Sequence, residues 1–154
     1  MPTELTLRRA SGAVALVGIG VATYITIENA GGGAPVCIAG GGGCETVANS
    51  SYSHLMGVNV AVFGILGYVM LLGAAFMRGD AARFGGLMLA MAGFGFSAYL
   101  TYLELFVIDA ICQWCVGSAV LMTVLFVINA IRAYGYAGSE LRSEGTGPPP
   151  SDSA

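Results

Sequence analysis

The 154-residue sequence is 56% hydrophobic and only 10% charged, with a mean hydropathy of +0.77 and a net charge of −3. These values lie outside the usual range of soluble domains and within that of multi-span membrane proteins. The chain has no lysine and its six arginines are scattered, so no basic surface of the kind that binds nucleic acid is expected.

The first apolar stretch covers residues 12–29, close to the roughly 20 residues that a transmembrane helix needs. Arg8 and Arg9 precede it and small residues follow it. This pattern also fits a cleaved signal peptide or, more weakly, a twin-arginine export signal. We favour a retained span, because the stretch is long for a signal peptide and because the later arginines then agree with one orientation.

A glycine-rich loop with two cysteines follows. Its segment CIAGGGGC, from Cys37 to Cys44, places four consecutive glycines between the thiols. Glycine loses more backbone freedom on ordering than any other residue, so this run indicates a mobile segment. The plainest interpretation is a loop closed by a disulfide, and the alternative is a pair of thiols that moves between two partners. The next segment, SSYSHLMG, is a candidate for a short helix along the membrane surface.

The second and third spans are expected at residues 57–77 and 84–108, separated by a turn that contains Arg78 and Arg83. Glu104 lies inside the third span. A carboxylate inside a membrane is costly, so Glu104 is a candidate functional residue, in ligand binding or proton transfer. The alternative is that it reaches the interface or hydrogen-bonds to a neighbouring helix.

The fourth span, residues 111–131, starts with the motif CQWC, Cys112 to Cys115. At a helix start both thiols share a face, and unpaired backbone N–H groups favour the thiolate that exchanges with disulfides. Such a redox dithiol at the membrane rim could pass electrons to a lipid-soluble quinone. Trp114 offers a flat face to a ring or an anchor at the interface, and Asp109 is expected to cap the helix.

The arginines orient the chain, because cytoplasmic loops are enriched in them. All six lie before the first span, between the second and third, or after the fourth. We therefore predict a multi-pass protein of the cell (inner) membrane, with both termini cytoplasmic and all four cysteines on the extracytoplasmic, oxidising side. Residues 1–137 would form an all-α bundle of four transmembrane helices, and residues 138–154 a disordered cytoplasmic tail.

The residues alone leave three classes of protein open. The first is a dithiol oxidoreductase, and the second is a structural four-span protein whose disulfides stabilise its outer face. The third is a four-cysteine metal site, which would need tetrahedral geometry from one flexible pair and one helical pair. No cluster of histidines or carboxylates supports a metal, so we assign none.

Three spaced motifs occur together: the loop cysteine pair, then VANSSYSHLMGVNVAVFGILGY, then YLTYLELFVIDAICQWC. Together they resemble the vitamin K epoxide reductase family, in particular its bacterial homologues. The resemblance implies a four-helix bundle around a quinone, ubiquinone or menaquinone. It also implies a thioredoxin-like partner outside the cytoplasm, which forms disulfides in exported proteins. Many bacterial members carry that partner as a fused domain, whereas here we expect a separate protein.

The resemblance also implies a role for each cysteine. Carried over by position, Cys37 would exchange with the partner's dithiol. Cys44 would relay electrons to Cys112 through a transient disulfide. Cys115 would be the thiolate beside the quinone.

Two further positions refine the comparison with the family. Ser50, six residues after Cys44, matches a loop serine that would hydrogen-bond near the quinone. Ser51 is the alternative match, and helix capping is the structural alternative for both serines. Ala119 stands where animal members carry a tyrosine, so quinone reduction is implied and vitamin K epoxide reduction is not.

Overall fold

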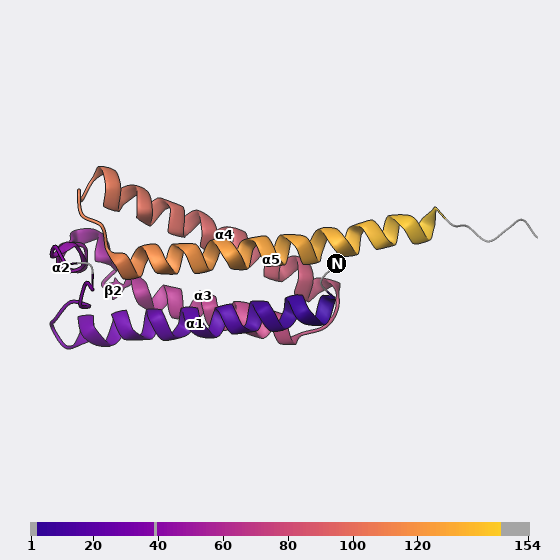
Figure 1. The fold of residues 1–154 in the computed structure, drawn as a ribbon, viewed down its shortest axis with the longest axis horizontal. Helices are drawn as coiled ribbons and strands as arrows, with labels where there is room; N and C mark the ends of the chain where they lie inside the picture. Colours follow the sequence, from indigo (N-terminus) through magenta and orange to yellow (C-terminus); the bar gives the residue numbers. More distant parts are fainter. Residues whose placement is uncertain (1–2, 39, 146–154) are drawn as a thin grey trace, which may run out of the picture.

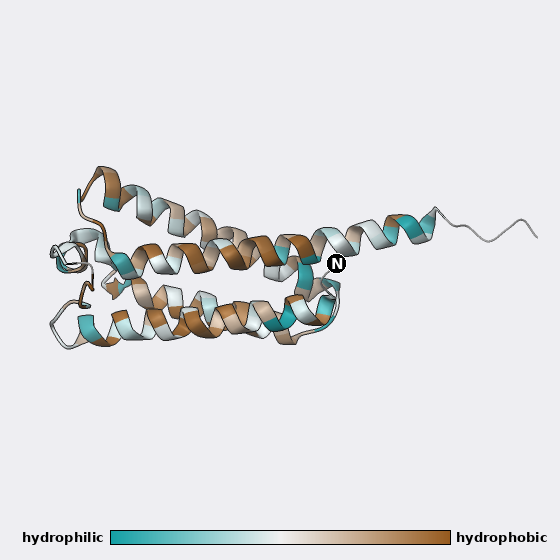
Figure 2. Cartoon of the chain, viewed as in Figure 1, coloured by the Kyte–Doolittle hydropathy of each residue, from teal (hydrophilic) through white to brown (hydrophobic). Residues whose placement is uncertain are grey.

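Among the described residues, four long helices form the body of the protein, and they are arranged as Figure 1 shows. The structure is a computed structural model that describes residues 3–38 and 40–145. The helices are α1 (Glu4–Ala30), α3 (Val60–Phe76), α4 (Asp80–Phe106) and α5 (Gln113–Glu144). Apolar residues dominate most of their length, and polar residues gather toward the ends of the bundle (Figure 2). A mainly helical arrangement of apolar helices is therefore confirmed, with the two short strands described below as the exception to the all-α prediction.

Within the described part of the chain, three helices are long and apolar enough to cross a membrane, namely α1, α4 and α5. α3 is also apolar but has 17 residues, fewer than the roughly 20 of a full span. The prediction of several apolar helices of membrane-spanning length is thus confirmed. The prediction of four complete spans stays a prediction.

The helix boundaries differ from the predicted ones in several places. α1 begins at Glu4, well before the predicted start at residue 12, and α4 begins at Asp80 instead of residue 84. Residues 57–59, expected in the second span, belong to a hairpin, and α3 starts at Val60 because the Asn59 side chain caps it. α5 continues to Glu144, so residues 138–144 are helical and not part of a disordered tail. The remaining tail residues, 146–154, lie outside the described residues.

The segment between α1 and α3 covers one end of the bundle. It contains α2 (Gly43–Ala48), the single-turn helix η1 (Ser51–Ser53) and the strands β1 (His54–Leu55) and β2 (Val58–Asn59). The strands pair antiparallel around a two-residue turn, Met56 and Gly57, whose φ angles of 54° and 83° suit such a hairpin. The prediction of a surface helix in SSYSHLMG is therefore wrong, because that segment forms η1 and the hairpin. The short helix of this segment is α2.

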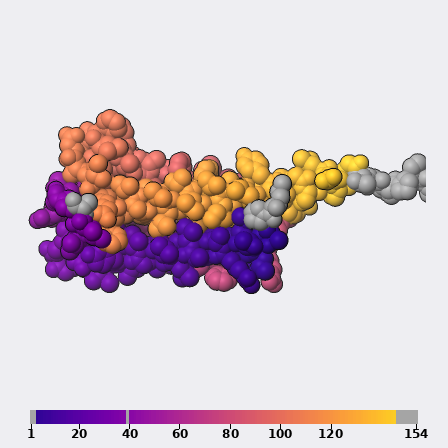
Figure 3. All heavy atoms as spheres, in the orientation of Figure 1, coloured from indigo at the N-terminus to yellow at the C-terminus, as the bar shows by residue number. Residues whose placement is uncertain are grey.

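Tyr68 of α3 joins three helices at the centre of the bundle. Its ring is fully buried, and Gly18 of α1 lies so close that a Cβ there would overlap the ring. Its hydroxyl hydrogen-bonds to Ser118 of α5, at 2.9 Å to the carbonyl oxygen and 2.8 Å to Oγ. α1 and α5 also lie side by side along one face (Figure 3). These contacts hold in register the helix ends that carry the cysteines.

Candidate functional site

The loop cysteines are joined to each other. Cys37 and Cys44 form a disulfide with their Cα atoms 5.8 Å apart. Cys44 is the second residue of α2 and is buried, whereas Cys37 is half-buried. The backbone N–H of Cys44 donates to Sγ of Cys37 at 3.3 Å. The Cys37–Cys44 pair is thus an oxidised dithiol, and Cys37 is the more accessible of its two cysteines.

The glycines of this loop have a conformational role. Gly40, Gly41 and Gly42 have φ angles of 74°, 102° and 63°, which residues with side chains rarely adopt. Gly43 then packs so closely that a Cβ would overlap the carbonyl of Ile111. The glycines therefore turn the chain and allow α2 to press against the segment before α5. A hinge function for them stays a prediction.

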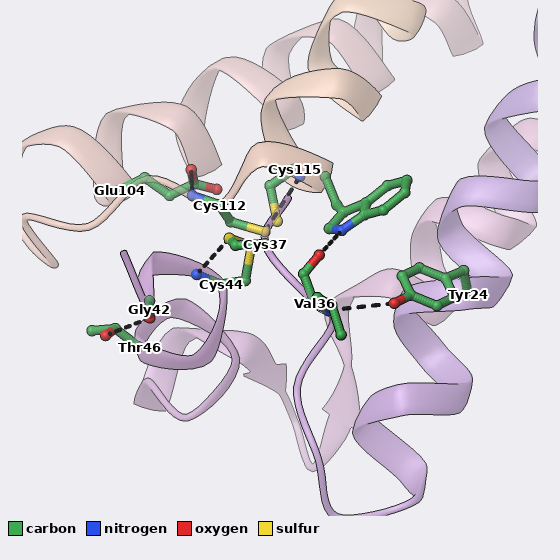
Figure 4. Close-up of a disulfide and its surroundings, with 10 residues drawn as sticks. Tyr24, Val36, Cys37, Gly42, Cys44, Thr46, Glu104, Cys112 and Cys115 are labelled. Atoms are coloured by element: carbon green, nitrogen blue, oxygen red, sulfur yellow. Dashed lines mark hydrogen bonds between the residues drawn. A yellow bond between two sulfur atoms is a disulfide. The ribbon is translucent and has the colours of Figure 1, made fainter. Parts of the chain in front are cut away.

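The second cysteine pair is free and stands at the start of α5. Cys112 is the N-cap residue, and its Sγ accepts the N–H of Cys115 at 3.4 Å. The expectation that Asp109 caps this helix is wrong, because Cys112 is the N-cap residue and Asp109 lies in the loop before it, with φ of 52°. Cys112 is buried and Cys115 half-buried. Figure 4 shows these two thiols directed toward the Cys37–Cys44 disulfide.

The side chain of Glu104, in the last turn of α4, lies beside the free cysteines. The residue is only 4% exposed, and its Oε2 accepts the backbone N–H of Cys112 at 3.1 Å. Its carboxyl group also interacts with the Cys115 thiol. Glu104 therefore holds the segment that carries the free thiols, as well as placing an ionisable group beside them.

A mainly apolar pocket lies beside the free cysteines, with about 560 Å³ of empty space that is partly open to the surroundings. It is bounded by the ends of α1, α3, α4 and α5 and by the segment that contains α2. Its sulfur and polar lining comes from Cys44, Ser50, Tyr52, Ser53, Asn59, Glu104, Cys112 and Cys115. Five of the residues expected in the site are thus brought to one pocket: Cys44, Ser50, Glu104, Cys112 and Cys115.

The geometry of the pocket distinguishes between the two serine candidates, Ser50 and Ser51. Ser50 lines the pocket, and its hydroxyl donates to the carbonyl of Val47 at 2.7 Å, so only its lone pairs remain for a ligand. Ser51 starts η1 and does not line the pocket. The structure therefore favours Ser50 as the residue nearer to a ligand.

Trp114 lies away from the pocket and holds the loop in place. Its indole Nε1–H donates to the carbonyl of Val36 at 2.9 Å, and Tyr24 Oη accepts the N–H of the same residue at 3.3 Å. The two rings pack with centroids 4.9 Å apart. The residue before Cys37 is thereby fixed to α1 and α5, as Figure 4 shows. A ring contact between Trp114 and a ligand in the pocket is not supported.

Asn59 also belongs to the pocket, although its sequence position predicted no such role. Its Oδ1 accepts the N–H of Ala61 at 2.8 Å and caps α3. Its Nδ2 is buried and has no hydrogen-bond partner among the residues that the structure describes, and the residue lines the pocket. An asparagine before an apolar helix indicates only a cap, so the unpaired amide could not be read from the sequence.

Among residues 3–38 and 40–145, no group of three or more histidine, cysteine, aspartate or glutamate side chains is placed to hold a metal ion. Two thiols of the proposed four-cysteine site are already joined in a disulfide. The side-chain chemistry at this end of the bundle is therefore that of dithiols beside an apolar pocket.

Apolar membrane-length helices that hold two cysteine pairs beside such a pocket define a multi-pass membrane redox protein. The sequence matches the model of the vitamin K epoxide reductase family over residues 9–130, well over half of the chain. The protein therefore belongs to the vitamin K epoxide reductase family. The match contains all four cysteines and ends within α5. Members of this family are generally oxidoreductases, and membership indicates a membrane function in disulfide and quinone redox chemistry.

Proposed function

We propose that the protein is a membrane thiol:quinone oxidoreductase that oxidises the dithiol of a separate thioredoxin-like protein and so supports disulfide formation in exported proteins. The observation that carries this proposal is the shared position of both cysteine pairs. Cys44, Cys112 and Cys115 all line one apolar pocket, with one pair oxidised and the other reduced. Electrons can then move between the pairs by thiol–disulfide exchange alone.

Cys37 is the entry point for electrons in this proposal, because it is the more exposed sulfur of the loop disulfide. A thiolate of the partner attacks Cys37, forms a mixed disulfide and releases Cys44 as a thiolate. The partner's second thiolate then displaces Cys37. The partner leaves with its own disulfide, and the loop pair holds two more electrons.

The second transfer joins the two pairs of this chain. When Cys112 and Cys115 are oxidised, the Cys44 thiolate attacks Cys112 and releases Cys115. Cys37 then closes on Cys44, which restores the loop disulfide and leaves Cys112 and Cys115 reduced. In the structure the loop pair is oxidised and the second pair is reduced, which is the state that this step leaves.

The pocket has the features that a quinone ring requires. Its walls are mainly apolar, and the unpaired Nδ2 of Asn59 is a donor for a carbonyl oxygen. A bound quinone supplies a two-electron, two-proton acceptor, either ubiquinone or menaquinone. Cys115 and Cys112 give up two electrons as they close their own disulfide, and Glu104 is the ionisable group in place to move a proton.

The alternative is a structural membrane protein stabilised by disulfides on its outer face. The Cys37–Cys44 disulfide fits this alternative equally well. The free pair does not, because two reduced thiols beside an oxidised pair add no cross-link. A structural protein would also have no use for an unpaired amide in an apolar pocket.

The proposal is tested with the purified protein in detergent, a reduced thioredoxin-like protein and a soluble quinone, followed by quinone absorbance. We expect turnover that Cys115→Ala abolishes. When the partner is supplied oxidised, a mixed disulfide with Cys37 should form in Cys44→Ala, because the Cys37 thiolate attacks the partner's disulfide and releases one partner thiolate. Thr123→Ala, on the same helix and exposed, is the matched control and should keep wild-type turnover. Full quinone reduction by the Cys112→Ala/Cys115→Ala variant would refute the mechanism.

A further inference from the structure

The end of the bundle opposite the cysteines contains a second pocket, which the redox proposal does not use. It has about 470 Å³ of empty space and lies where α1 begins, α3 ends, α4 begins and α5 passes. Four of the six arginines of the chain line it: Arg8, Arg78, Arg83 and Arg132. Glu4 is the one carboxylate among the described residues that line it.

Two of these arginines are neutralised by carboxylates. Arg132 is 3% exposed and its Nη2 contacts Glu4 Oε1 at 3.2 Å. Arg83 contacts the same Glu4 oxygen at 3.7 Å and Asp80 Oδ1 at 3.3 Å. Two negative charges therefore balance these two guanidinium groups.

The other two arginines leave an excess of positive charge. Arg8 donates from Nε to the carbonyl of Ala75 at 2.9 Å and from Nη2 to that of Phe76 at 2.7 Å, and both acceptors are neutral. Arg78 forms no ion pair with a described residue. Arg8 is also fixed in position by its two carbonyl contacts, so its charge is held at the pocket wall. Two guanidinium groups of the pocket thus have no carboxylate partner among the described residues, which favours an anionic ligand.

The backbone and the rim of the pocket add two further features. α4 begins after Gly79, which lines the pocket, has φ of 116° and provides no side-chain cap, so first-turn N–H groups remain for a ligand. Met77 lines the pocket and is 64% exposed, and Phe76, whose carbonyl accepts from Arg8, is 72% exposed. An anion with attached apolar chains would match both the charge and this apolar rim.

We propose that this pocket binds the phosphate group of an anionic phospholipid. Guanidinium groups pair with phosphate oxygens through two parallel hydrogen bonds, and basic pockets between membrane helices suit anionic headgroups. The phosphate would contact Arg8 and Arg78, and the acyl chains would lie along Phe76 and Met77. The site is independent of the thiol chemistry at the other end of the bundle.

The test measures the melting temperature of the full-length protein in detergent as lipid or salt is added. Phosphatidylglycerol should raise it, whereas phosphatidylcholine and inorganic phosphate at equal concentration should not. We expect Arg78→Gln to weaken phosphatidylglycerol binding about tenfold, the effect of one charge-assisted hydrogen bond. Arg78→Lys, which keeps the charge, should recover part of the affinity.

Arg9→Gln is the matched control, because Arg9 is exposed, adjacent to Arg8 and absent from the pocket lining. It should leave the response to phosphatidylglycerol unchanged. An equal response to phosphatidylcholine, or an equal loss in Arg9→Gln and Arg78→Gln, would overturn the proposal. A response to inorganic phosphate as large as that to phosphatidylglycerol would overturn the lipid as the source of the anion. Circular dichroism of each variant in detergent confirms that it is folded.

Discussion

Asn59 combines a structural and a chemical role in one side chain. Its Oδ1 caps α3, and its Nδ2 is left without a partner at the wall of the pocket. A buried amide hydrogen without an acceptor costs free energy, commonly about 1–3 kcal/mol. A ligand with a carbonyl oxygen at this position would remove that cost, so Asn59 contributes to affinity for a quinone if one binds here.

Asn59→Asp separates these two roles. The carboxylate still accepts the N–H of Ala61 and caps α3, but it has no N–H to donate. We expect a KM for quinone raised about three- to tenfold, the value of one hydrogen bond, and a lowered thermal stability, because the second carboxylate oxygen is buried without a partner. Steady-state kinetics with a soluble quinone measure this, with Asn59→Ala as a control that loses both roles. An unchanged KM in Asn59→Asp would show that Nδ2 does not contact the quinone.

Trp114 is a second single residue of interest, because it restrains Val36, the residue before Cys37. Trp114→Phe keeps an aromatic ring against Tyr24 but removes the N–H that holds the Val36 carbonyl. We expect the loop disulfide to be reduced faster by a small thiol, by up to about fivefold, since one hydrogen bond contributes about 1 kcal/mol. Alkylation of the released thiols followed by mass spectrometry gives the rate.

Tyr134→Phe is the control for this variant, because Tyr134 is an exposed aromatic residue toward the opposite end of α5. It should leave the reduction rate unchanged. If Trp114→Phe is reduced at the wild-type rate as well, Val36 does not limit the movement of Cys37.

At the scale of elements, the close contact of α2 with the segment before α5 brings the two cysteine pairs together. Gly43 makes this contact possible, because a Cβ would overlap the Ile111 carbonyl. In Gly43→Ala the short helix must move away from Ile111, and Cys44 moves with it. We expect slower exchange between Cys44 and Cys112, together with a loss of about 1–3 kcal/mol in the free energy of unfolding from overpacking.

Disulfide trapping measures this exchange directly. In a Cys37→Ser/Cys115→Ser background, Cys44 and Cys112 are the remaining cysteines, and a mild oxidant should join them. The added Gly43→Ala change should slow this reaction, whereas Gly117→Ala, at a helical glycine with open space, should not. Equal trapping rates in the two variants would show that α2 is not held by Gly43.

The helices and the connecting segment differ in how far the sequence could predict them. Long apolar runs predict the apolar parts of α1, α4 and α5, because hydropathy is a local property. They do not predict the more polar helical residues at the start of α1 and at the end of α5. The segment from 31 to 59 depends on contacts between residues far apart in the chain, such as Trp114 with Val36, so its local pattern predicted a helix in place of η1 and the hairpin. The sequence indicated that the two cysteine pairs undergo thiol–disulfide exchange. It did not indicate that they lie beside a common pocket.

On the scale of the whole molecule, the two ends differ in chemistry. One end contains all four cysteines beside an apolar pocket, and the other contains most of the arginines, tied together by Glu4 and Arg132, which are 128 residues apart. Charged groups of this kind stay on the cytoplasmic side of a membrane more readily than they cross it. We therefore propose that the cysteine end faces the extracytoplasmic, oxidising side and the arginine end faces the cytoplasm.

Labelling of intact cells with a membrane-impermeant maleimide tests this orientation. Cys37 is half-buried, so a variant that keeps it as the sole cysteine, with Cys44, Cys112 and Cys115 changed to serine, should react without permeabilisation. A cysteine-free background with Ser143→Cys, at the exposed end of α5, should react only after detergent is added. Because detergent exposes both positions equally, it serves as the internal control for reactivity. Labelling of Ser143→Cys in intact cells, with Cys37 protected, would reverse the orientation and place the loop disulfide in the reducing cytoplasm, where thiol oxidation for export would have no purpose.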